Sequence, residues 1–133
     1  MRYNIFIVFL ALVIQGCASN TKGLGHGYRL SYYTEDMSRA SGAWEGTAHY
    51  TALFYHSQRL GACGWVSIAP SGKFALFEAN GKLFLFDASS SQTRDVTDGS
   101  FALPNIANWL EAESAVDVTY SGQRNSSRIS LPK

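Results

Sequence analysis

Cysteine and histidine side chains are the main candidates for chemistry in this chain of 133 residues. The cysteines are Cys17 and Cys63, and the histidines are His26, His49 and His56. A cysteine nucleophile needs a base beside it, and only sequence proximity links His49 and His56 to Cys63. The stretch GACG around Cys63 favours a buried thiol that packs as a small hydrophobe over a catalytic thiol.

The histidines and carboxylates do not match a familiar metal or catalytic pattern. His49 and His56 are seven residues apart, so on one strand they would point to opposite faces. Glu35-Asp36 and the pair Glu111 and Glu113 are typical of solvated ends of elements, and the Gly-x-Ser-x-Gly nucleophile elbow is absent. We therefore expect no metal, no cofactor and no enzymatic activity. The alternative is a small hydrolase that uses a histidine with an aspartate or glutamate.

The segment before Cys17 is typical of a signal peptide. The chain begins with a short positive segment, Met1–Asn4, and continues with ten apolar residues, Ile5–Ile14. A membrane-spanning helix needs about 20 apolar residues, whereas this run has the size of a signal-peptide core. No turn or cap residue bounds the run, which favours a signal-peptide helix over a buried strand or helix of the folded domain.

The residues that end at Cys17, VIQGC, resemble the lipobox of bacterial lipoproteins. Ile14, Gly16 and Cys17 match that motif, and Gln15 is a tolerated residue. The resemblance implies that a diacylglycerol is transferred to the Cys17 sulfur and that the chain is cleaved between Gly16 and Cys17. Several acyl chains anchor a protein stably, where one holds it only marginally. Cleavage after Ala18 by an ordinary signal peptidase is the competing interpretation.

An acylated Cys17 would make the lipid bilayer the first partner of the protein and leave Cys63 without a disulfide partner. Ala18 is not the aspartate that favours inner-membrane retention in such lipoproteins. We therefore expect an outer-membrane location facing the periplasm over an inner-membrane one. An envelope protein of unknown identity is the second candidate partner.

Length and charge indicate one ordinary folded domain. Arg2 lies in the expected signal peptide, so ten of the eleven Lys and Arg residues remain to balance ten Asp and Glu. A balanced charge gives no reason to expect nucleic-acid binding. We divide the chain into a signal peptide (1–16), a tether (17–27), a β-rich domain (28–120) and a polar, mobile tail (121–133).

Three parts of the domain have strand-like composition. Residues 28–34, YRLSYYT, are aromatic and predict a strand. Residues 48–60 favour two strands that turn near Ser57-Gln58, although Gly61 could instead cap a helix. Residues 115–120, AVDVTY, alternate apolar and polar side chains as a half-buried strand does.

Residues 64–89 predict a three-stranded antiparallel meander, with a short fourth strand at 93–97. Asn80-Gly81 is a preferred two-residue hairpin turn, and it would pair Phe77 with Phe84. A second turn at Pro70-Ser71-Gly72 would pair Ile68 with Phe74 and Val66 with Leu76.

A short helix is expected over Leu103–Glu113. Pro104 suits a first helical turn, and Leu103, Ile106, Ala107 and Leu110 recur at helical spacing. The expected fold class is therefore mainly β (α+β): an antiparallel meander sheet with one short C-terminal helix, preceded by the signal-peptide helix.

Part of the meander resembles a single β-propeller blade. The stretch VSIAPSGK, residues 66–73, is similar to the Ser-Pro-Asp-Gly-Lys turn of Tol-type and WD-repeat blades, and LFLFD, residues 83–87, is similar to their third strand. Ala69 and Ser71 depart from the usual residues. No second copy is visible, so the resemblance implies local blade-like geometry and no propeller function.

The meander is apolar on both faces, so both faces need a cover. Strand alternation sends Val66, Ile68, Phe74, Leu76, Leu83 and Leu85 to one face and Trp65, Ala75, Phe77, Phe84 and Phe86 to the other. We expect the helix to cover one face and the N-terminal strands to cover the other. Where the aromatic face stays open, its residues become the candidate partner surface: Trp65, Phe77, Phe84 and Phe86. The expected function is a membrane-anchored binding or structural module.

Overall fold

The computed structural model describes residues 20–36, 47–99 and 102–133, and these residues are almost entirely β structure. The expectation of a mainly β fold is confirmed. The structure contains a single short 3-10 turn within these ranges, η1 (Glu111–Glu113). The strands are β1 (Thr21–Gly25), β2 (Tyr28–Asp36), β3 (Thr47–Tyr55), β4 (Gln58–Ala62), β5 (Trp65–Ile68), β6 (Phe74–Ala79), β7 (Lys82–Asp87), β8 (Gln92–Asp95), β9 (Pro104–Leu110), β10 (Ala115–Tyr120) and β11 (Ser126–Ser130).

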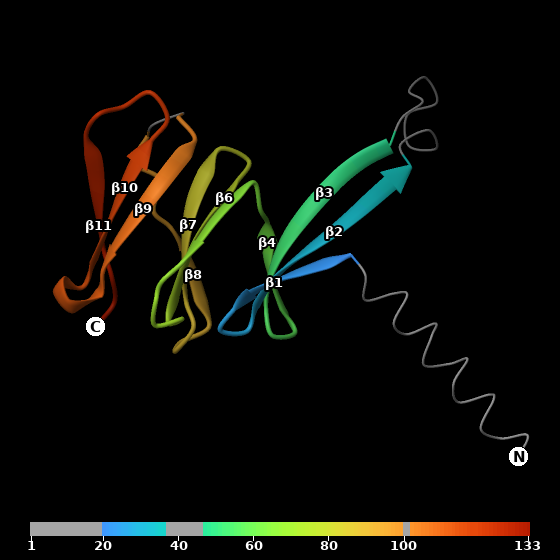
Figure 1. The fold of residues 1–133 in the computed structure, drawn as a ribbon, viewed down its shortest axis with the longest axis horizontal. Helices are drawn as coiled ribbons and strands as arrows, with labels where there is room; N and C mark the ends of the chain where they lie inside the picture. Colours follow the sequence, from blue (N-terminus) through green and yellow to red (C-terminus); the bar gives the residue numbers. More distant parts are fainter. Residues whose placement is uncertain (1–19, 37–46, 100–101) are drawn as a thin grey trace, which may run out of the picture.

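The strands form three antiparallel sheets that follow one another along the chain. The first sheet has the order β1-β2-β3-β4, the middle sheet β5-β6-β7-β8 and the third sheet β9-β10-β11. Each strand pairs with its neighbour in sequence, so every sheet is an up-and-down meander. The sheets follow one another as three layers, and the paired strands β2 and β3 extend beyond the others (Figure 1).

The middle sheet is built around the predicted Asn80-Gly81 hairpin. Both turn residues have positive φ, 53° at Asn80 and 80° at Gly81, as a type I′ turn requires. The predicted pairing of Phe77 with Phe84 is confirmed, and the expected fourth strand is β8. The strand pair expected over residues 48–60 is β3 and β4.

The register predicted between β5 and β6 is wrong by one residue. Val66 pairs with Phe77 and Ile68 with Ala75. The loop is one residue longer than the predicted three-residue turn, because the Ala69 N–H donates to the Phe74 carbonyl at 2.9 Å and leaves residues 70–73 between the strands. Since side chains alternate along a strand, every β5 residue lies on the face of the sheet opposite to the predicted one.

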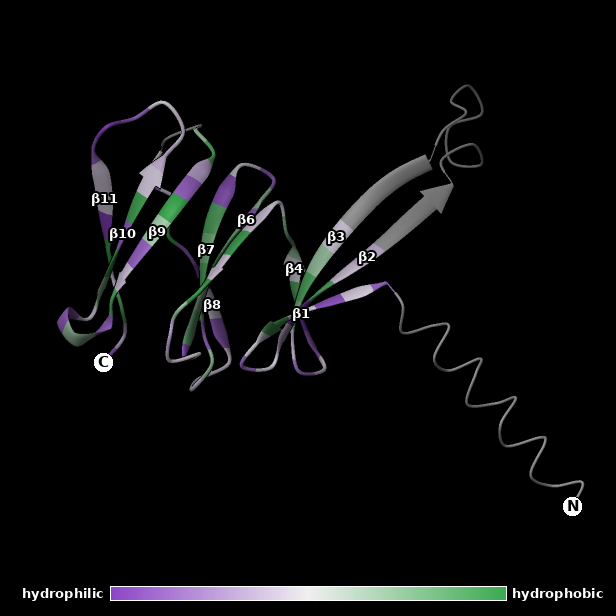
Figure 2. Ribbon diagram, in the orientation of Figure 1, coloured by the Kyte–Doolittle hydropathy of each residue, from purple (hydrophilic) through white to green (hydrophobic). Residues whose placement is uncertain are grey.

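Two hydrophobic cores cover the two faces of the middle sheet. The first core, between the first and middle sheets, contains Tyr28, Leu53, Cys63, Ala75, Phe77 and Phe86. The second core, between the middle and third sheets, contains Ala69, Phe74, Leu76, Leu83, Leu85, Val116, Val118, Tyr120, Ile129 and Leu131. Hydrophobic segments run along β6, β7 and β10 (Figure 2). The expectation that both faces are covered is confirmed.

The helix predicted over Leu103–Glu113 is wrong, because Pro104–Leu110 forms β9. Ala107 and Trp109 pack on the second core, whereas Ile106, directly before Ala107, is 59% exposed, as strand alternation requires. A helix of two to three turns has little stability alone. As a strand, the same segment pairs with β10 along its length and joins the layer that covers the middle sheet.

Two segments expected to lack structure belong to the sheets. The tether was predicted over residues 17–27, but Thr21–Gly25 pairs with β2 as β1. The tail was predicted over 121–133, but β11 pairs with β10, and both Ile129 and the following Leu131 are buried in the second core. Polar composition suggested mobility in both cases, and partner strands supply the hydrogen bonds that override it. The expected signal-peptide helix lies outside the described residues.

Candidate functional site

The aromatic residues predicted as a partner surface do not share one surface. Phe77 is 2% exposed and Phe86 is fully buried in the first core. Trp65 packs against the second core, on the opposite face, because the observed register pairs it with Glu78 of β6. Phe84 is half-buried at the edge of the first core.

What remains of the predicted surface is a groove beside Phe84, which we call the β4–β7 groove. The Phe77 and Phe84 rings stack at a centroid distance of 5.5 Å with an interplanar angle of 24°. The groove has a volume of about 400 Å³. Its lining comes from β4, β6, β7, β8 and the β6–β7 turn: Leu60, Gly61, Ala62, Phe77, Ala79, Asn80, Lys82, Phe84 and Thr93.

The chemistry of the β4–β7 groove suits a ligand with an apolar group and a negative charge. Its volume lies in the range of small-ligand pockets, which combine an apolar lining with few polar groups. Among the described residues of the lining, Lys82 alone is charged. Gly61 lies against Phe77, since a Cβ at this position would be 3.5 Å from the ring, and its lack of a side chain lets β4 approach the ring closely. Sequence reasoning identified Phe77 and Phe84 but missed the β4 residues that line the groove, because these reach the groove only when the first and middle sheets pack together.

Cys63 lies in the segment between β4 and β5, where it is a free, buried thiol. Its Sγ lies 3.4 Å from the Trp65 carbonyl oxygen. Burial, followed by the nearby Glu78 carboxylate, raises the pKa of the Cys63 thiol to about 11. The thiolate that a nucleophile requires is therefore disfavoured, and the prediction of a buried free thiol is confirmed.

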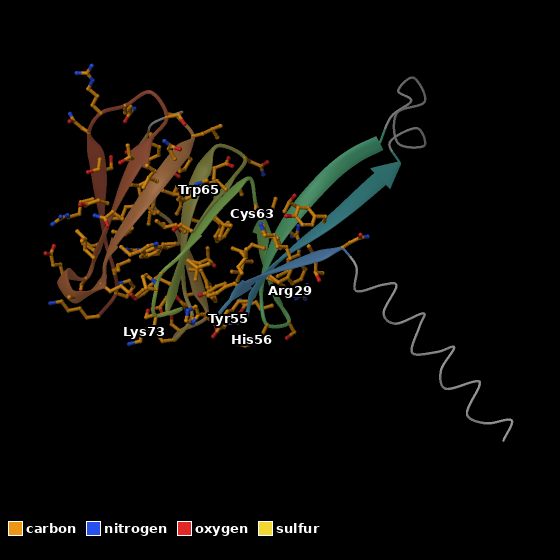
Figure 3. The ribbon with its side chains drawn as sticks, viewed as in Figure 1. Arg29, Tyr55, His56, Cys63, Trp65 and Lys73 are labelled. Atoms are coloured by element: carbon orange, nitrogen blue, oxygen red, sulfur yellow. The ribbon has the colours of Figure 1, made fainter. Side chains whose placement is uncertain are left out.

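His26 lies in the β1–β2 turn and lines a hollow together with Tyr55 and Lys73. His56 lies in the β3–β4 turn, at the edge of the molecule that also carries Tyr55 and Lys73 (Figure 3). Both histidines have positive φ, 54° and 51°. The His56 ring packs on Gly27, where a Cβ would lie 2.6 Å from it, and the His26 ring packs on Gly72 in the same way. The His56 ring thus packs the β3–β4 turn against the β1–β2 turn, and the His26 ring packs the β1–β2 turn against the β5–β6 loop.

A second hollow of about 310 Å³ lies on this edge and is lined by His26, Tyr55, Ser71, Gly72, Lys73, Ala88 and Ser89. No described histidine forms an ion pair with a carboxylate, and the described residues contain no group of three potential metal ligands. The side chain of His49 lies outside those described.

The carboxylates considered for acid–base chemistry have structural partners. Glu111 accepts hydrogen bonds from the backbone N–H of Ser71, at 3.2 Å, and from its hydroxyl, which joins η1 to the β5–β6 loop. Glu113 lies 3.8 Å from Arg128. Arg128 also donates two hydrogen bonds to Asp117, which lower the pKa of that carboxyl. The side chains of Glu35-Asp36 lie outside those described.

Comparison with known proteins gives no relative for this chain. No family model, no curated protein and no solved structure matches it. Gly16 and Cys17, the expected cleavage and acylation residues, lie outside the described part of the chain. Within that part, no helix is long and apolar enough to cross a membrane.

Proposed function

We propose that this chain is a lipid-anchored envelope lipoprotein whose β domain is a small binding module. The lipobox resemblance over Ile14–Cys17 supports acylation at Cys17. The anchor would hold the domain at the outer membrane, facing the periplasm. The inner membrane is the alternative location for the same anchor.

The β4–β7 groove carries the binding role. It pairs a stacked aromatic floor, Phe77 on Phe84, with one cation, Lys82, at a volume of about 400 Å³. An apolar residue beside a carboxylate, as in a segment of an envelope protein, has the matching chemistry. This occupant would bury apolar area on Phe84, which is half-buried in the free protein.

Site-specific crosslinking in cells tests the binding role. Phe84 is replaced by the photoreactive analogue p-benzoylphenylalanine, and the control carries the analogue at Ile106, which is exposed on the third sheet. We expect one discrete protein adduct from position 84 that is absent at position 106, and a several-fold loss of that adduct with Lys82→Gln. Equal adducts at both positions, or none at position 84, would contradict a binding groove.

The anchor has a separate test. Cys17→Ser should remove fatty-acid labelling and shift the protein from the detergent phase to the aqueous phase. Wild-type protein without label, or a variant that still partitions with membranes, would contradict acylation at Cys17.

A further inference from the structure

The distance between the proposed anchor and the first sheet is short. Cys17 and Thr21, where β1 begins, are four residues apart. Four extended residues span at most about 14 Å. This step depends on the proposed acylation of Cys17, and given that anchor the first sheet is held at the bilayer surface. The third sheet lies at the other end of the stack, beyond the middle sheet.

Among the described residues, no other sheet packs on one face of the first sheet, and we call it the outer face. Tyr28, Leu30 and Leu53 point into the first core. Because side chains alternate along a strand, their neighbours Arg29 and Phe54 lie on the opposite, outer face. Strand pairing places Arg29 beside Phe54, and Phe54 beside Arg59 on β4. The outer face therefore carries a row of cation, aromatic ring and cation across three strands.

The contacts within this row leave its cations available to a partner. The Arg29 guanidinium lies 4.2 Å from the centroid of the Phe54 ring, and Arg59 is exposed. The described salt bridges involve neither arginine. Both guanidinium groups can therefore donate to anions in front of the sheet.

Charge distinguishes this face from the rest of the molecule. The strands β1, β3 and β4 contain no acidic residue. The acidic residues of β2 are Glu35 and Asp36, at its C-terminal end. From Thr47 onward, every acidic residue follows β4: Glu78, Asp87, Asp95, Asp98, Glu111, Glu113 and Asp117. On the third sheet, Arg128 is already neutralised by Asp117.

We propose that the outer face of the first sheet docks on the anionic phospholipid headgroups of the membrane that holds the anchor. Guanidinium groups bind phosphate through paired hydrogen bonds, and phenylalanine is among the residues with which membrane-surface elements enter the boundary between headgroups and acyl chains. The short connection to Cys17 brings Arg29, Phe54 and Arg59 within reach of that layer. Docking would fix the orientation of the domain and leave the β4–β7 groove, on the other side of the first sheet, open to the periplasm.

Photocrosslinking to lipid tests this orientation. The acylated full-length protein carries p-benzoylphenylalanine at position 54, or at position 106 as control, and is reconstituted in phosphatidylethanolamine vesicles with or without phosphatidylglycerol. Position 54 lies on β3, two strands from the anchored strand, so an adduct there reports the orientation of the sheet and not contact of β1 alone. We expect at least tenfold more phospholipid adduct at position 54 than at 106 with phosphatidylglycerol present. Arg29→Gln with Arg59→Gln should reduce the adduct several-fold, and the control pair Arg124→Gln with Lys133→Gln should not.

The outcomes separate this inference from the proposed function. Equal lipid adducts at 54 and 106, or an adduct that does not depend on phosphatidylglycerol, would overturn the docking face while the anchor stands. A protein adduct at position 54 in cells, in place of lipid, would assign the face to a protein and also overturn it. An intact mass without acyl groups on Cys17 would instead overturn the anchor, and with it the tethered orientation.

Discussion

The hydroxyl of Tyr28 donates a buried hydrogen bond of 3.0 Å to the carbonyl oxygen of Gly72. This contact joins β2 of the first sheet to the β5–β6 loop of the middle sheet. The Tyr28 ring also packs at 4.8 Å from the Tyr55 ring and edge-on against Phe86 at 6.2 Å. A single side chain thus fixes the first sheet on the middle sheet by both apolar and polar contacts.

Tyr28→Phe is expected to reduce the free energy of unfolding by about 1–2 kcal/mol, because it leaves the buried Gly72 carbonyl without its donor. Urea titration followed by circular dichroism measures the change. Tyr32→Phe is the matched control, because Tyr32 is 46% exposed on the same strand, and it should alter stability by less than about 0.5 kcal/mol. Equal effects of the two substitutions would mean that the Tyr28 bond contributes nothing.

Stability should fall as pH rises from about 9 toward 11. Burial raises the pKa of the Cys63 thiol from 9.0 to about 11, so the folded state holds a proton that the unfolded chain releases. The protonated Cys63 thiol therefore contributes its full stabilisation below pH 9. This contribution, about 2–3 kcal/mol of the free energy of unfolding, is lost as the pH approaches 11. Cys63→Ala should weaken the dependence of stability on pH between pH 8.5 and 10. Burial also raises the pKa of Tyr28, which adds its own pH dependence above this range. A variant with the wild-type slope would show that Cys63 is not the group responsible.

The two phenylalanines of β7 should differ in their contribution to stability. Phe86 is fully buried, and Phe86→Ala should cost about 3–5 kcal/mol. Phe84 is half-buried, so Phe84→Ala should cost less and instead weaken groove binding. Denaturant midpoints of both variants provide the comparison. A Phe84 variant as unstable as the Phe86 variant would assign both residues to the core.

Gly27→Ala should destabilise the protein more than Gly81→Ala. Both glycines have positive φ, 88° and 80°, so each alanine carries a backbone cost of about 1–2 kcal/mol. A Cβ at Gly81 meets open space, whereas a Cβ at Gly27 would lie 2.6 Å from the His56 ring. Thermal melts of the two variants measure the difference, and His56→Ala should relieve part of the Gly27→Ala defect. Identical melting temperatures would show that the ring moves aside freely.

The local structure of the β6–β7 hairpin was determined by the sequence alone. Asn80 and Gly81 accept positive φ at both central positions of the turn, and a two-residue turn allows one register. Cys63 was likewise predictable as a buried thiol from its apolar neighbours. In the groove, Phe77 and Phe84 could be identified as aromatic neighbours from this register before any packing was known.

The tertiary structure decided the conformation of β9 and the orientation of β5. The segment PNIANWL has apolar residues compatible with either helical or strand spacing, and pairing with β10 selects the strand. Trp109 then faces the second core, where its indole N–H donates to the Ser67 hydroxyl at 2.9 Å. One residue of loop length between Ala69 and Phe74 turned Trp65 toward that core and separated it from Phe77. Local sequence specifies turns and alternation, but only the packing of three sheets determines which face of a strand is buried and where a groove stays open.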